Sequence, residues 1–215
     1  DNATYIDGNN ILMFVTNQGS FGRDLSGVFG YDYGTFWPYN GVQYILDGSQ
    51  VASPLYASGL WVGGVDSVSG DTLVKVAIYN SEYRHGPVVG GTFVADADPL
   101  QTYIKTYKLY GDSLAGNPNA DYTNWIWAAR MGAPFDGDSA TPKMIGDQMC
   151  WAVYNDYDPA KVNDAGSTDP IGLEIRQTTF AFRREGPLNN IVFVKLQAYN
   201  RGSKTIQNCY FSLWS

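Results

Sequence analysis

The sequence contains few of the residues on which most enzyme active sites depend. Of its 215 residues one is histidine, His85, and two are cysteine. Hydrolase triads and most zinc sites require a well-placed histidine or several cysteines, and "EYRHGP" around His85 is typical of a surface loop. The glycines of "GVFGYDYG" at 27–34 precede no helical pattern, so they do not make a phosphate-binding or dinucleotide-binding loop. We therefore expect neither an enzyme nor an organic cofactor.

Charged side chains are also scarce. They make up 16% of the chain, whereas about 25% is usual for a soluble domain. The net charge is −7, and Arg183-Arg184 is the densest basic pair. Nucleic acids and anionic membrane surfaces attract proteins that carry a basic patch. No apolar run approaches the roughly 20 residues of a membrane-spanning helix. We expect no nucleic-acid binding and no membrane insertion.

The apolar residues follow the pattern of a β-protein. They make up 44% of the chain and occur in short or alternating runs bounded by Gly, Asn, Asp and Pro, which is typical of strands and turns. We predict an all-β fold: one domain over residues 1–215, an antiparallel, jelly-roll-like β-sandwich with long Gly-, Asp- and Asn-rich loops and at most one short helix. The predicted strands span 10–17, 56–66, 71–80, 101–111, 148–155, 171–184, 191–200 and 205–214, and the helix falls within 119–132.

Two details of this pattern lead to sharper predictions. In the strand at 71–80, alternation places Val74 and Val76 on the core face and Lys75 on the opposite face. The last three strands are long and joined by short connections, so we expect them to follow one another in one antiparallel sheet.

Cys150 and Cys209 each lie in a predicted strand. We predict a disulfide between them, which would close a loop of about 60 residues and contribute roughly 3–4 kcal/mol of stability. The alternative is two buried free thiols, because cysteine is among the most buried residue types.

The most polar segment is "YNDYDPAKVNDAGSTDP" at 154–170. Calcium takes about six to eight oxygen ligands, and Asp156, Asp158, Asn163 and Asp164 are the candidate ligands of a calcium loop. The segment lacks the glycine and glutamate positions of an EF-hand. Asn and Asp are also common turn formers, so a polar connection between two strands is the alternative.

Two further sets of residues admit a functional and a structural interpretation. Glu174 in "GLEIRQ" is a candidate glycosidase carboxylate, although such a residue more often pairs with a cross-strand Arg or Lys. Exposed rings among the six Trp and sixteen Tyr would suit sugar stacking, whereas strand-face packing is the alternative. We expect most Trp to be buried and several Tyr to be at the surface.

Several separated motifs resemble one family. These are "SGLWVGGV" at 58–65, "GAPFDGD" at 132–138, "TPKMIGDQMCWAVYNDYDP" at 141–159 and "NNIVFVKLQAYNRGSKTIQNCYFSLWS" at 189–215. They resemble large secreted proteins of the Bacteroidetes–Ignavibacteria kind, which commonly carry a sorting domain for type IX secretion. The resemblance implies export, a surface or extracellular location and a β-rich architecture, and it implies no known reaction. In those relatives "FSLWS" runs on into an acidic loop, so we expect the natural chain to be longer.

These observations together predict a secreted, non-catalytic structural or surface module. We expect it to bind itself, as a self-assembling subunit of a filament or surface layer, or to bind other surface proteins or glycans. The alternative is a carbohydrate-binding module or an accessory domain of a polysaccharide-degrading enzyme, and a third is a hydrolase with two facing carboxylates.

Overall fold

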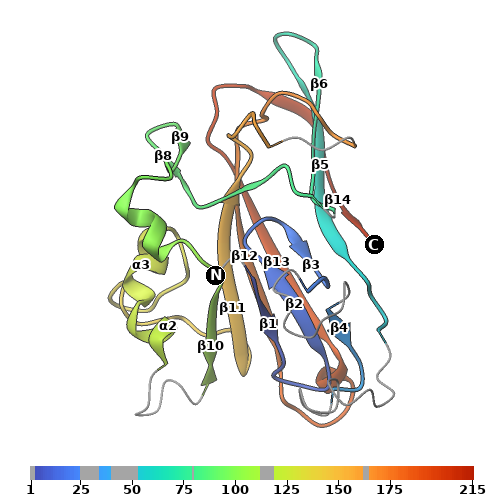
Figure 1. Ribbon diagram of the computed structural model, residues 1–215, viewed down its shortest axis with the longest axis vertical. Coiled ribbons are helices and arrows are strands. Elements are labelled where there is room, and N and C mark those ends of the chain that lie inside the picture. The colour runs from blue at the N-terminus through green and yellow to red at the C-terminus, as the bar shows by residue number, and fades with distance from the viewer. Residues whose placement is uncertain (1–2, 25–33, 40–52, 79, 112–118, 162–164) are drawn as a thin grey trace.

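The computed structural model describes residues 3–24, 34–39, 53–78, 80–111, 119–161 and 165–215 (Figure 1). Most of the regular structure is β, as predicted. None of the helices in these ranges is both long and apolar enough to cross a membrane. The strands are β1 Ala3–Ile6, β2 Leu12–Thr16, β3 Ser20–Phe21, β4 Thr35–Phe36, β5 Ser58–Asp66, β6 Thr72–Val76, β7 Arg84–His85, β8 Val88–Val89, β9 Thr92–Phe93, β10 Tyr107–Tyr110, β11 Gln148–Asn155, β12 Leu173–Ala181, β13 Val192–Asn200 and β14 Ile206–Trp214. The helices are η1 Pro99–Tyr103, α2 Ala120–Thr123, α3 Trp125–Arg130 and η3 Pro187–Asn190.

Two antiparallel sheets face each other. The first has the order β1-β2-β3-β5-β14, with β4 on β2 and β6 on β5. The second has the order β10-β11-β12-β13, with β7 on β11, and β8 and β9 form a separate hairpin. Ile6 and Val15 of the first sheet pack with Cys150 and Ala181 of the second. The arrangement is therefore sandwich-like, with apolar side chains filling the space between the sheets.

The second sheet is covered on its other face as well. Trp125 and Ala128 of α3 pack with Met149, Trp151 and Val153 of β11, and Figure 1 shows α2 and α3 beside β10 and β11. Successive side chains of a strand point to opposite faces, so a strand between two layers has no solvent side. All eight residues of β11 are accordingly buried, which explains why this segment is almost continuously apolar.

Two predicted elements differ from the structure. The predicted strand at 101–111 is the 3-10 helix η1 followed by the short strand β10. This helix begins there because Pro99 occupies its first turn and the Asp98 carboxylate accepts a hydrogen bond from the Leu100 N–H. In place of one short helix there are two, α2 and α3, which meet at Asn124.

The last three strands do not share one sheet, contrary to the prediction. β12 and β13 pair along their length, but β14 pairs with β5 of the first sheet. Residues 201–205 carry the chain from one sheet to the other, and the Arg201 N–H anchors this turn by donating to the Gly172 carbonyl at 2.8 Å. β13 and β14 therefore end their sheets, and each has one edge without a strand partner in the described part of the chain.

The packing around β11 predicts a large effect of truncating its central ring. Trp151 is 1% exposed and contacts two other buried aromatic rings of this core, Tyr107 and Trp125, with ring centres 6.2 and 6.3 Å away. We expect Trp151→Ala to lower the free energy of unfolding by about 3–5 kcal/mol, because it leaves a cavity under α3. Urea denaturation in dilute solution, followed by circular dichroism, measures this. Tyr210→Ala, at a ring that is 72% exposed, is the control, and equal losses in the two variants would contradict the assignment of this core.

Candidate functional site

Asp156, in the polar segment singled out above, binds the main chain. Its two carboxylate oxygens accept hydrogen bonds from the N–H groups of Ile171, Gly172 and Leu173, the shortest at 2.6 Å. The residue is fully buried. Burial raises the pKa of Asp156, and the three N–H groups act in the opposite direction. This carboxylate fixes the start of β12 against the end of β11.

The other candidate calcium ligands have mixed outcomes. Asp158 is buried and forms an ion pair with Arg84 at 2.7 Å, and Arg84 also contacts Asp96. Asn163 and Asp164 lie outside the described residues. Among the residues that are described, no group of three or more His, Cys, Asp or Glu side chains could hold a metal. Because two of the four candidate ligands lie outside the described residues, the calcium loop stays a prediction.

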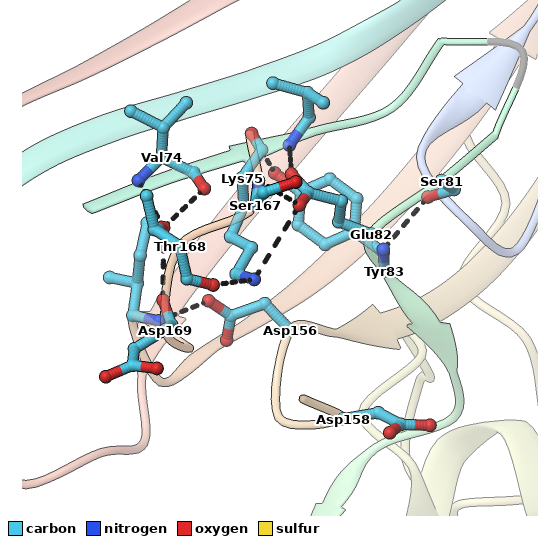
Figure 2. Close-up of polar contacts among 12 residues, drawn as sticks. Val74, Lys75, Ser81, Glu82, Tyr83, Asp156, Asp158, Ser167, Thr168 and Asp169 are labelled. Atoms are coloured by element: carbon cyan, nitrogen blue, oxygen red, sulfur yellow. Dashed lines mark hydrogen bonds and ion pairs between the residues drawn. The ribbon is translucent and has the colours of Figure 1, made fainter. Parts of the chain in front are cut away.

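A buried ion pair lies beneath the same segment (Figure 2). Lys75 of β6 and Glu82 are both 0% exposed, and the Lys75 Nζ lies 3.9 Å from Glu82 Oε1. Lys75 Nζ also donates to the Thr168 carbonyl at 2.6 Å, while Glu82 accepts from the N–H groups of Val76 and Ser167. The two charges are therefore paired with each other and bonded to the main chain, which is the condition under which buried charges are tolerated.

Lys75 corrects the prediction about the faces of β6. In the register with β5, Lys75 lies opposite Val62, which is buried in the core. Residues directly opposite in a sheet share a face, so Lys75 points inward. The alternation of Val74 and Val76 suggested the reverse, because a lysine is rarely buried unless it is paired. Its partner Glu82 lies in a turn beyond the strand, and no local pattern in the sequence indicates that the two residues meet.

Together these contacts fasten residues 165–172 onto β6. The Thr168 hydroxyl accepts from the Val74 N–H and donates to the Val74 carbonyl, both at 2.8 Å, as a neighbouring strand would. Gly166 allows the close approach, since a Cβ atom there would lie 1.9 Å from the Glu82 carboxylate. The polar groups of this cluster are bonded to each other, so the geometry supports a structural fastening.

Glu174 follows its structural interpretation. It is 1% exposed, and its Oε1 accepts from Arg176 Nε at 3.0 Å and from Arg201 Nη2 at 3.2 Å. Its Oε2 accepts from the Val88 N–H at 2.9 Å. The aromatic side chains follow their structural interpretation only in part. The expectation that most Trp are buried is wrong, because only Trp125 and Trp151 are buried, whereas Trp37 is 44% exposed and the other three are half-buried.

The predicted disulfide is absent. Cys150 and Cys209 are both free. Cys150 lies in the middle of β11, where its Sγ is near the Tyr5 carbonyl, whereas Cys209 lies in an irregular stretch of β14, in the other sheet. The predicted pairing is wrong because the two strands belong to different sheets, and Cys150 is buried whereas Cys209 is exposed. Burial raises the pKa of Cys150 to about 12, and partial burial also raises the pKa of Cys209.

The free edge of the first sheet exposes apolar side chains. Phe211 and Leu213 of β14 lie opposite Val62 and Leu60, which are buried between the sheets. They are therefore on the inner face of the sheet, yet they are 50% and 54% exposed. On the outer face Tyr210 is 72% exposed. The second sheet thus does not extend far enough to cover β14.

The chain matches no protein-family model, no curated protein and no solved structure. The resemblance to secreted surface proteins therefore stays a prediction, and the function must be argued from the molecule itself.

The bonding of Asp156 leads to a stability prediction. We expect Asp156→Asn to lower the free energy of unfolding by about 1–3 kcal/mol, because the new NH2 group faces main-chain donors and leaves them unsatisfied. Thermal or urea unfolding at neutral pH measures this. Asp169→Asn changes the same chemistry at an exposed residue of the same segment, and we expect less than about 0.5 kcal/mol there. An equal effect of both substitutions would mean that the three N–H contacts of Asp156 contribute nothing.

The cysteines differ in exposure, which predicts selective alkylation. Treatment of the native protein with iodoacetamide should modify Cys209 and leave Cys150 intact. The thiolate is the reactive form. Cys150 is 1% exposed, and its burial also raises its pKa and so disfavours the thiolate. Mass spectrometry of tryptic peptides identifies the modified residue. The protein unfolded in guanidinium is the control and should be modified at both cysteines. Resistance of both thiols in the native protein, followed by release on reduction, would instead indicate a disulfide.

Proposed function

We propose that this protein is a non-catalytic structural module of an extracellular or cell-surface layer, and that it associates with other copies of itself through β14. The observation that carries the proposal is the free edge of β14 with its exposed Tyr210, Phe211 and Leu213. The other parts of the proposal, export and a surface location, are supported by the composition and by the family resemblance.

The edge strand lacks charge and proline, two of the features that protect such edges in monomeric proteins. β14 reads "IQNCYFSLW" and contains no charged residue and no proline. Edge strands of soluble proteins are usually short, twisted away or marked by inward-pointing charges, because an open edge invites another strand. After an irregular stretch at 207–210, residues 210–214 pair regularly with β5, so this end of β14 presents a row of main-chain groups as well as an apolar face.

The lack of charge on β14 makes this strand a suitable place for a second copy to bind. The chain carries 21 acidic and 14 basic residues, so two copies repel each other over much of their surfaces. β14 carries no charge, and it is therefore a segment at which like-charged copies approach with little repulsion. A strand that pairs with its own copy antiparallel across a two-fold axis makes a closed interface.

The geometry of pairing decides between a dimer and a filament. Pairing of β14 with β14 of the second copy closes as a dimer, whereas pairing of β14 with the free edge of β13 in the next copy is head-to-tail and propagates. The mass distribution in solution separates the two. We expect the fraction of assembled protein to rise with protein concentration in either arrangement.

Association should be lost when β14 carries a charge. We expect Leu213→Lys to remain monomeric at concentrations at which the unaltered protein assembles, because a lysine on an edge strand must be desolvated when another strand pairs there. Sedimentation velocity and negative-stain microscopy measure the assembly. The matched control is Val68→Lys, which replaces an apolar side chain that is 89% exposed in the turn between β5 and β6. The proposal is wrong if the unaltered protein is monomeric at every concentration. It is also wrong if Leu213→Lys assembles to the same extent as the unaltered protein.

A further inference from the structure

A pocket of about 380 Å³ lies where the β8–β9 hairpin, the end of α3 and the start of β12 meet. Part of its wall is apolar and comes from Val88, Leu100 and Met131. The rest carries three arginines from three segments: Arg130 of α3, Arg176 of β12 and Arg201 of the turn after β13. Pockets that take small ligands commonly have about this volume and combine apolar walls with a few fixed polar groups.

Two of the arginines are held in place from several sides. Arg176 and Arg201 both bond to Glu174 Oε1, and both guanidinium groups lie over the ring of Tyr199, at 4.5 and 5.0 Å from its centre. Gly132 leaves room for Arg176, since a Cβ atom there would lie 2.1 Å from the guanidinium carbon. A guanidinium fixed in this way loses little conformational freedom when a ligand binds.

The pocket has an excess of positive charge in an acidic protein. Three arginines and one glutamate line it, whereas the chain as a whole carries −7. Arg130 stacks on Trp127 at 4.5 Å, and no carboxylate of the described residues lies within ion-pair distance of it. The one carboxylate in the wall, Glu174, therefore leaves two positive charges without a counter-charge in the pocket.

A second hollow continues from the first. It has a volume of about 390 Å³ and shares Gly91 and Arg201 with the first pocket. Its wall includes Tyr157 and Lys204, and the buried hydroxyl of Tyr157 has no hydrogen-bond partner in the described part of the chain. Arg201 lies where the two hollows meet, so a ligand longer than the first pocket would pass this residue.

We propose that this groove binds a ligand that carries a carboxylate group, held by Arg130, Arg176 and Arg201. The planar fork of a guanidinium matches a carboxylate by paired hydrogen bonds. Such a carboxylate belongs either to a free organic acid or to the uronic acid units of an acidic glycan. The proposal does not depend on self-association, because no residue of β14 lines either hollow.

Isothermal titration calorimetry at low ionic strength tests the proposal with three probes: sodium propionate, sodium D-glucuronate and uncharged D-glucose. We expect saturable binding of at least one acid in the millimolar range or tighter, no binding of glucose, and weakening by added salt because charge pairing drives the contact. Binding of propionate and glucuronate alike identifies the carboxylate as sufficient. Binding of glucuronate alone identifies an acidic glycan.

Three variants assign the binding to the groove. Arg201→Ala and Arg130→Ala should each weaken the binding about ten-fold, because each removes charge-assisted hydrogen bonds to the ligand. Arg184→Ala is the matched control, since Arg184 pairs with Asp147 after the far end of β12. Arg130→Ala decides the outcome if Arg201→Ala does not fold. The proposal is overturned if neither acid binds saturably, if glucose binds as well as glucuronate, or if both groove variants bind like the unaltered protein.

Discussion

The structure depends on the burial of β11 on both of its faces. One face of this strand packs against the first sheet and the other packs under α3. A strand in this position has no solvent side, so its main-chain groups must be satisfied by neighbouring strands, which β10, β12 and β7 provide. The helices, the second sheet and the first sheet are thereby fixed relative to a single element.

Buried polar residues hold the connection between β11 and β12 in place, in addition to the packing of apolar side chains. Asp156 binds three main-chain N–H groups as the chain leaves β11 and returns as β12. Lys75 and Glu82 hold the same connection to β6. Removing one member of such a buried set leaves the others unpaired in a medium of low polarity, so it destabilises the fold more than the loss of one member of an exposed ion pair does.

The turn at 201–205 connects the two surfaces for which we propose a role. It directs β14 to the first sheet and away from β13, which leaves both sheets with a free edge. It also places Arg201 beside Arg176, where both bond to Glu174. An apolar edge suited to another strand and a cationic groove suited to an acid thus arise from one change of sheet, although their ligands and their energetics differ.

The sequence by itself determined the β class and the bounds of three of the four long strands near the C-terminus, whereas β12 was predicted two to three residues too long at each end. β11 was predicted at its observed bounds and β13 and β14 to within one residue, because runs of apolar and aromatic residues between turn formers are a local signal. It also indicated that Glu174 pairs with a basic residue, although the observed partners, Arg176 and Arg201, lie on the same strand and in a turn and not on a facing strand. Only the tertiary structure decided that β14 joins the first sheet, that Cys150 and Cys209 stay apart, that Lys75 points inward and that three distant arginines share a pocket. Each of these depends on which segments meet in space, and the short-range periodicity of a chain carries no record of that choice.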